Sequence, residues 1–171
     1  MTSATPTQPH RVLIVDDSPI FAEGLQMLIE VDPALKVVGV ARDGEQAIEL
    51  VQKLRPDVIT MDLRMPRLGG PEAIERIMAV RPTPILVLSA AEELLDERFG
   101  QSLRDRGATS VRAKPRLVDA TVAFAEMREQ LKAMAAQGTN LSPLPTHVAL
   151  RKPLTPTPGT IRGVSEPAEP P

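Results

Sequence analysis

The chain has 171 residues, of which 42% are hydrophobic and 25% charged, with a formal net charge of -2. This composition fits one globular domain with a less ordered segment, and it provides no basic patch for nucleic acid or a membrane surface. The absence of cysteine and the presence of only His10 and His147 argue against disulfides, thiolate metal sites, histidine triads and multi-histidine metal sites. Because there is no apolar run of membrane-spanning length and no secretory signal, we expect a cytoplasmic protein.

Five short β-rich segments alternate with helical patterns between residues 11 and 138. The predicted strands are residues 11–15, 36–41, 57–61, 84–88 and 109–113. Three of these segments, VLIV, VITM and ILVLS, are nearly continuous apolar runs. Such runs are typical of strands in a parallel sheet that helices cover on both faces.

A helical pattern follows each predicted strand. The first has Ser18 as N-cap and a proline at its first position, the second ends before Pro56, and the third begins at Pro71. The fourth carries an apolar face but contains Gly100, which disfavours a helix by about 1 kcal/mol relative to alanine. The members of that face are Leu94, Leu95, Phe99 and Leu103.

The fifth helical pattern covers residues 116–137, and its spacing fits a coiled-coil seam and a stripe facing the sheet about equally well. At about 22 residues it would extend about 33 Å, longer than the sheet needs. We therefore expect its end to project and to offer Leu131 and Met134 to a partner.

Proline content marks the domain boundary. Of the 18 prolines, 8 lie in the 33 residues 139–171, where the apolar residues follow neither period 2 nor period 3.6. We expect a Pro-rich disordered tail or linker there, a short disordered lead at residues 1–10, and one domain at residues 11–138. The regular alternation within this domain predicts an α/β fold, (βα)₅, with a doubly wound five-stranded parallel sheet and a site beyond the carboxyl ends of its strands.

Polar residues follow the predicted strands at that edge. Asp16 and Asp17 follow the first strand, Asp62 the third, Ser89 the fourth and Lys114 the fifth. Three carboxylates held close together repel one another, and a divalent cation such as Mg²⁺ or Mn²⁺ removes that repulsion. The set fits phosphoryl transfer onto a carboxylate, with Asp62 as nucleophile and Mg²⁺, Lys114 and Ser89 each neutralising or binding one phosphoryl oxygen.

These residues also resemble a known family. The string RVLIVDDSP, the MD followed by LRMPRLGG, the Ser89-Ala90 pair and the KP after the fifth strand are similar to the receiver domain of two-component response regulators, over residues 11 to about 134. More narrowly, DPALKVVGVARDG, RPDVITMDLRMPR and RPTPILVLSA resemble the receiver domain of chemotaxis protein-glutamate methylesterases. The resemblance implies the flavodoxin-like receiver fold.

The resemblance also implies residue roles. Asp62 would be the phosphoacceptor, Ser89 would contact the phosphoryl group, and Lys114 would pair with it. The implied Mg²⁺ ligands are the carboxylates of Asp16, Asp17 and Asp62 and the main-chain carbonyl of Arg64. The family often has an aromatic residue where this chain has Val111, so coupling through an aromatic rotamer is not expected, and Lys114-Pro115 is a candidate cis peptide.

The implied function is a phosphorylation-dependent response regulator that accepts a phosphoryl group from a sensor histidine kinase and signals by contact with an unknown downstream protein in a chemotaxis-type phosphorelay. Its own chemistry would be limited to self-phosphorylation and autodephosphorylation.

Three other functions fit the sequence less well. No Gly-x-Ser-x-Gly elbow follows residue 138, so a methylesterase reading requires the chain to be the N-terminal regulatory fragment of that enzyme. A Mg²⁺-dependent phosphatase calls for a second carboxylate two residues after the nucleophile, where Arg64 stands. A transcription factor lacks a helix-turn-helix pattern after residue 137.

Overall fold

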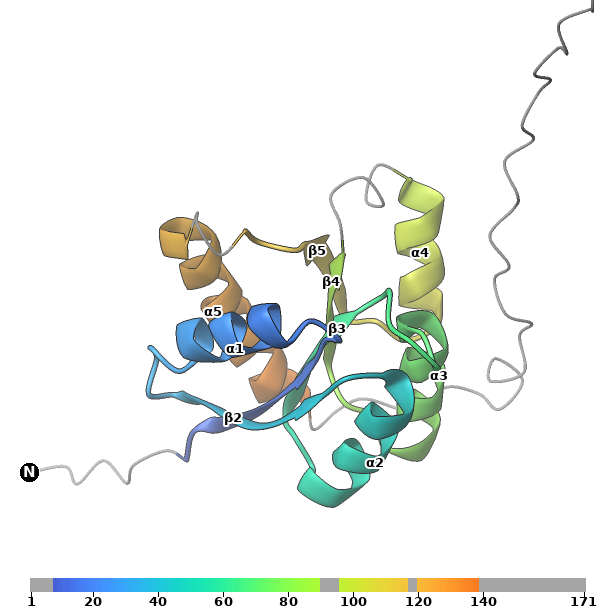
Figure 1. The fold of residues 1–171 in the computed structure, drawn as a ribbon, viewed down its shortest axis with the longest axis horizontal. Helices are drawn as coiled ribbons and strands as arrows, with labels where there is room; N and C mark the ends of the chain where they lie inside the picture. Colours follow the sequence, from blue (N-terminus) through green and yellow to red (C-terminus); the bar gives the residue numbers. More distant parts are fainter. Residues whose placement is uncertain (1–7, 90–95, 117–119, 139–171) are drawn as a thin grey trace, which may run out of the picture.

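Strands and helices alternate along the chain in the computed structural model, which describes residues 8–89, 96–116 and 120–138 (Figure 1). The strands are β1 (His10–Val15), β2 (Leu35–Ala41), β3 (Val58–Asp62), β4 (Ile85–Ser89) and β5 (Ser110–Ala113). The helices are α1 (Pro19–Ile29), α2 (Gly44–Leu54), α3 (Gly70–Val80), α4 (Glu97–Asp105) and α5 (Ala120–Gln137). This order confirms the predicted five strand–helix pairs.

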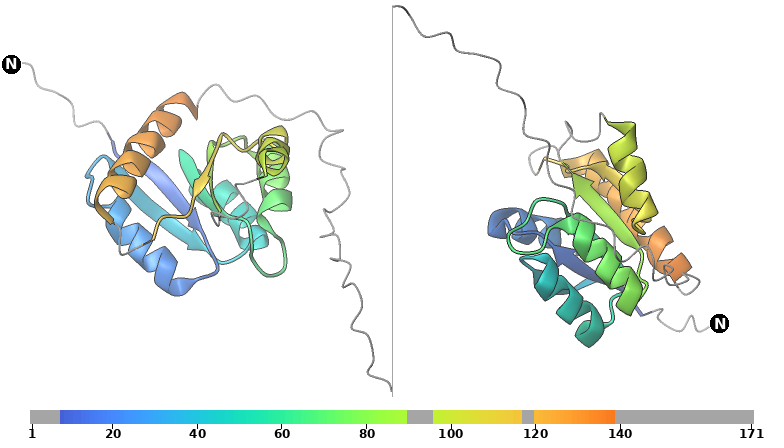
Figure 2. Two further views of the ribbon diagram at one scale, coloured as in Figure 1. Left: turned by 90° about the horizontal axis from the view of Figure 1, so that it is seen from above. Right: turned by 90° about the vertical axis from the view of Figure 1, so that its right-hand side faces the viewer.

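The five strands form one parallel sheet in the order β2-β1-β3-β4-β5. Helices α1 and α5 cover one face of the sheet, and α2, α3 and α4 cover the other (Figure 2). The strand order reverses between β1 and β3, which makes the carboxyl ends of these two strands the topological switch point. The predicted doubly wound α/β fold is therefore confirmed.

The hydrophobic core has two parts because both faces of the sheet are covered. In β1, Leu13 and Val15 belong to the cluster under α2 and α3, whereas Val12 and Ile14 belong to the cluster under α1 and α5. Successive side chains of a strand point to opposite faces, so a strand with two buried faces must be apolar throughout. This explains the continuous apolar runs in the sequence.

Local capping fixes where the helices begin and end. The Ser18 hydroxyl accepts a hydrogen bond from the Phe21 amide at 3.3 Å, which confirms the predicted N-cap of α1. The Asp43 carboxylate accepts from the Gln46 amide at 2.9 Å at the start of α2. Helix α2 ends at Leu54, and its C-cap Arg55 has a left-handed backbone (φ 49°) and precedes the predicted proline stop.

The projecting end predicted for the fifth helix is wrong. Leu131 and Met134 are buried beside Phe124 in the cluster between α1, α5 and the sheet. The Lys132 ammonium also lies 2.8 Å from the Asp32 carboxylate, which ties the end of α5 to the segment after α1. The apolar stripe therefore faces the sheet. Residue 116, the predicted first residue of this helix, lies outside it, and residues 117–119 are outside the described residues.

The structure also bears on the predicted fourth helix and on the predicted cis peptide bond. Helix α4 begins after Asp96 and includes the glycine that weakened its prediction, with Leu103 buried; Leu94 and Leu95 lie outside the described residues. The described residues contain no cis peptide bond, so the expected cis Lys114-Pro115 bond is wrong and the bond has the trans form that X–Pro bonds favour by about 0.5–1 kcal/mol.

Candidate functional site

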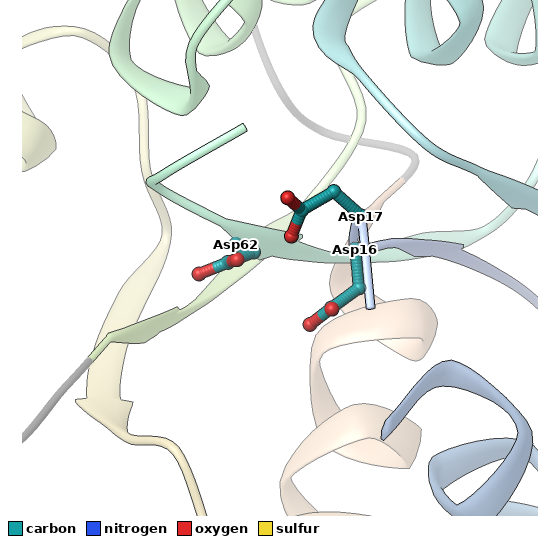
Figure 3. A group of neighbouring side chains, drawn as sticks. All are labelled: Asp16, Asp17 and Asp62. Carbon is teal, nitrogen blue, oxygen red and sulfur yellow. The ribbon is translucent and has the colours of Figure 1, made fainter. Parts of the chain in front are cut away.

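Three carboxylates meet at the switch point of the sheet. Asp16 and Asp17 follow β1, and Asp62 is the last residue of the neighbouring β3. Their side chains point into the same space (Figure 3), and carboxylate oxygens of the three residues lie within 4.8 Å of one another. The sequence placed these residues at one edge of the sheet, and the parallel pairing of β1 with β3 is what brings them together.

Asp16 is the buried member of the group, with 2% of its surface exposed. One carboxylate oxygen, Oδ1, accepts a hydrogen bond from the Ser18 amide at 2.9 Å. The other, Oδ2, lies 2.6 Å from the Lys114 ammonium. Burial of a carboxylate is unfavourable unless it is paired and hydrogen-bonded, and both conditions are met here. The bond to Ser18 also couples the site to the N-cap of α1.

Lys114 bridges the two neighbouring strand ends. Its ammonium lies 3.5 Å from Asp62 Oδ2 as well as near Asp16, and its backbone amide donates to the Ser89 carbonyl at 2.7 Å. The same ammonium lies 4.2 Å from the centre of the Phe21 ring, a cation–π arrangement. Phe21 is not among the site residues predicted from the sequence. The sequence feature that could have indicated its contact with the site is its position in the first turn of the helix that begins beside Asp16.

Neighbouring groups and burial have opposing effects on the pKa of Asp62. Burial raises the pKa of Asp62 above its ordinary value, the Lys114 ammonium lowers that pKa, and the Asp16 carboxylate raises it further. Oδ1 accepts a hydrogen bond from the Leu63 amide at 2.9 Å, so it is held in place, while Oδ2 faces Lys114. The result is a carboxylate that is oriented and partly desolvated, with a raised pKa. These are properties of a group that reacts with an electrophile.

The remaining predicted site residues lie at the ends of β1 and β4 and just after β3. Ser89 is fully buried at the end of β4, next to β3 in the sheet. Asp17 is exposed, so the carboxylate group opens to solvent on its side. Arg64 is an exposed residue two positions after Asp62, in the segment that joins β3 to α3. The fold therefore groups three carboxylates with an ammonium and places the Ser89 hydroxyl at the end of the adjacent strand.

The carboxylate group suits a hard divalent cation. Three carboxylates contribute oxygen ligands that Mg²⁺ prefers, and the exposed side leaves room for water and an incoming phosphoryl oxygen. The Lys114 ammonium near Asp16 and Asp62 offsets part of the repulsion among the carboxylates. The residues present therefore fit Mg²⁺.

None of the described helices has the length and hydrophobicity of a membrane span.

The amino-acid sequence is similar to that of known proteins. The profile of the response regulator receiver domain matches residues 12–126. A "Protein-glutamate methylesterase/protein-glutamine glutaminase 4" of Myxococcus xanthus is 44% identical over 130 residues, which cover 74% of this chain and 36% of that protein. A protein of the same description from Desulfitobacterium hafniense is 46% identical over 112 residues, covering 64% and 28% respectively. The chain spans about a third of the length of these curated relatives.

Known structures agree with the sequence matches. The response regulator domain of Thermotoga maritima CheB has 36% sequence identity and a TM-score of 0.63, covering 79% of this chain and 99% of that one. A two-component response regulator of the LuxR family from Aurantimonas has 29% identity and a TM-score of 0.65, covering 76% and 87%. With the profile match over most of the chain, these findings show that the chain belongs to the response regulator receiver domain family and is related to the receiver domains of protein-glutamate methylesterases.

Proposed function

We propose that this protein is a phosphorylation-dependent response regulator that accepts a phosphoryl group on Asp62 from a sensor histidine kinase. The observation that carries the proposal is the position of the Lys114 ammonium, 2.6 Å from Asp16 and 3.5 Å from Asp62 beside the exposed Asp17. An oriented carboxylate, a cation next to it and further acidic ligands are the components that phosphoryl transfer to an aspartate requires.

In this mechanism an oxygen of Asp62 forms the new O–P bond as the P–N bond to the donor histidine breaks. Lys114 neutralises one equatorial oxygen of the transferred group, and the Ser89 hydroxyl donates to another. Asp16, Asp17 and Asp62 would hold Mg²⁺ through their carboxylates, and Arg64 would hold it through its main-chain carbonyl. When bound, Mg²⁺ would supply further neutralisation of the negative charge on the phosphoryl group.

The output is proposed to be a contact with a downstream protein. Phosphorylation adds about -1.5 to -2 of charge at pH 7, by analogy with phosphoserine, next to the ends of β4 and β5. Val111 of β5 is partly buried against the core cluster under α2 and α3. A shift of β5 would therefore also displace the core residues that pack against Val111. We assign no nucleic-acid or membrane partner, and we place the protein in the cytoplasm.

The domain organisation follows the same proposal. Residues 10–138 would form the receiver, because β1 begins at His10, with residues 1–9 and 139–171 as flanking segments. The methylesterase relatives support a chemotaxis-type phosphorelay, and they also favour one alternative, that the chain is the N-terminal regulatory part of such an enzyme. Sequencing the gene beyond codon 171 distinguishes the two, because a hydrolase domain in the same reading frame favours the regulatory fragment.

The acceptor assignment is tested by labelling with ³²P-acetyl phosphate in the presence of Mg²⁺. Asp62→Asn is expected to lose the label, and so is the wild type in EDTA. Asp105→Asn, which changes an exposed carboxylate at the end of α4, is the matched control and should keep the wild-type rate. Labelling of Asp62→Asn at the wild-type rate would overturn the assignment. The catalysis we assign is limited to self-phosphorylation and autodephosphorylation.

A further inference from the structure

The segment between β3 and α3, residues 63–69, carries the Arg64 carbonyl that we assign to the divalent cation, so its position bears directly on cation binding. We infer that Asp43 and Arg67 form a clamp that positions this segment for the cation. The inference rests on the proposed function of the carboxylate group, and it adds two positioning residues that lie outside that group. Asp43 precedes α2, and Arg67 lies in the segment itself.

Asp43 is fully buried, and each of its oxygens has a partner. Oδ1 accepts from the Gln46 amide at 2.9 Å as the N-cap of α2, and Oδ2 pairs with the Arg67 guanidinium. Capping alone does not require a charge, because asparagine caps helices about as well as aspartate. A buried charge is costly unless it is paired. The negative charge of Asp43 is therefore explained by its pairing with Arg67 rather than by the cap.

Arg67 has a backbone conformation that needs external support. Its φ of 61° lies in the left-handed region, which costs a non-glycine residue about 1–2 kcal/mol. Such a conformation persists only where the surrounding structure holds it. The ion pair with Asp43 supplies this support from one side. The next residue along each segment adds a second contact, because the Leu68 carbonyl accepts a hydrogen bond from the Gly44 amide at 2.9 Å.

The segment is packed tightly at both ends. A Cβ on Gly44 would lie 2.7 Å from the Leu68 carbonyl oxygen, and a Cβ on Gly70 would lie 2.5 Å from the Asp62 carbonyl oxygen. The Leu68 side chain is itself buried in the core. The contacts of Gly70 and the Leu68 side chain keep the segment attached to the core without the clamp, whereas the Gly44–Leu68 hydrogen bond lies next to the ion pair and should open more often when the pair is lost. Loss of the ion pair should therefore loosen the exposed part that includes Arg64 rather than unfold the domain.

The sign of the effect separates positioning from simple electrostatics. Through space, removing a positive charge near the site strengthens the binding of a cation, and removing a negative charge weakens it. A clamp predicts that Arg67→Ala and Asp43→Asn both weaken Mg²⁺ binding, each by about tenfold as for residues that support metal ligands. Because the two residues act through one contact, the double variant should bind no more weakly than either single variant. Arg67→Lys should restore part of the affinity.

The test measures Mg²⁺ affinity by isothermal titration calorimetry and amide hydrogen exchange by NMR in the metal-free protein. Arg42→Ala is the matched control, because Arg42 is an exposed cation beside Asp43 and reports the through-space effect of losing one positive charge. Exchange of the Gly44 amide should be faster in both clamp variants and unchanged in the control. Thermal unfolding followed by circular dichroism verifies that each variant is folded.

The outcomes distinguish the two proposals. If the wild type binds no Mg²⁺, the proposed function of the carboxylate group fails, and the clamp loses its role with it. If the wild type binds Mg²⁺ and Arg67→Ala binds as tightly or more tightly, the clamp is refuted while the proposed function stands. Weakened binding in both single variants, together with faster exchange at Gly44, supports the clamp.

Discussion

The ion pair between Glu75 and Arg106 should be a major determinant of the stability of this domain. Glu75 lies on α3 and Arg106 directly after α4, and Arg106 Nη1 is 2.8 Å from Glu75 Oε1. Their side chains are only 6% and 5% exposed. Removing one partner of such a pair leaves the other charge buried without compensation, at a cost of about 3–5 kcal/mol. Replacing both partners with apolar residues of similar volume removes that cost.

A double-mutant cycle measures this directly. Glu75→Leu and Arg106→Leu should each lower the free energy of unfolding by about 3–5 kcal/mol, and the double variant should return close to the wild type. With a urea dependence of about 2 kcal/mol per M, each single variant should lose about 1.5–2.5 M in its unfolding midpoint. The chain has no tryptophan or tyrosine, so unfolding is best followed by far-ultraviolet circular dichroism.

An exposed ion pair provides the control. Glu129 lies 2.7 Å from Lys132 but its side chain is 74% exposed, so Glu129→Gln should change stability by at most about 1 kcal/mol. The reasoning is refuted if the single Glu75 and Arg106 variants stay within about 0.5 kcal/mol of the wild type. It is equally refuted if the double variant loses the sum of the two single losses, because the two charges would then be independent.

Three further predictions concern the site. Burial raises the pKa of Asp62, so ionisation of Asp62 destabilises the metal-free fold as pH rises from the ordinary pKa of 3.8 through the raised pKa of the folded state, and the loss is constant at higher pH. Asp62→Asn should therefore be more stable than the wild type at pH 7, and urea titrations at several pH values should show this difference vanish below pH 3.8. Mg²⁺ at 100 times its Kd should stabilise the protein by about 2.7 kcal/mol, and Asp17→Asn should lose most of this gain in thermal unfolding. Gly70→Ala should destabilise by about 1–3 kcal/mol or more, since its Cβ would meet backbone atoms of Asp62 and Leu63 at 2.5 and 2.7 Å; wild-type stability would contradict this close packing.

Much of the fold was predictable because local periodicity reports it. Apolar runs of four to five residues specified strands with two buried faces, and the serine and proline before α1 specified its first turn. The errors arose where a pattern had two structural meanings. The stripe on α5 fits an exposed seam or a buried face equally well, and only contact with the sheet decided that Leu131 and Met134 are buried.

The sequence by itself determined which acidic, hydroxyl and ammonium residues stand at the strand ends, because parallel strands place their carboxyl ends on one edge of a sheet. It could not determine that the Lys114 ammonium lies closer to Asp16 than to Asp62, that it sits over the Phe21 ring, or that Arg67 pairs with Asp43. Each of these contacts joins residues from different strands, helices or loops. Their distances depend on how the crossovers pack, which no local pattern in the chain encodes and only the tertiary structure decides.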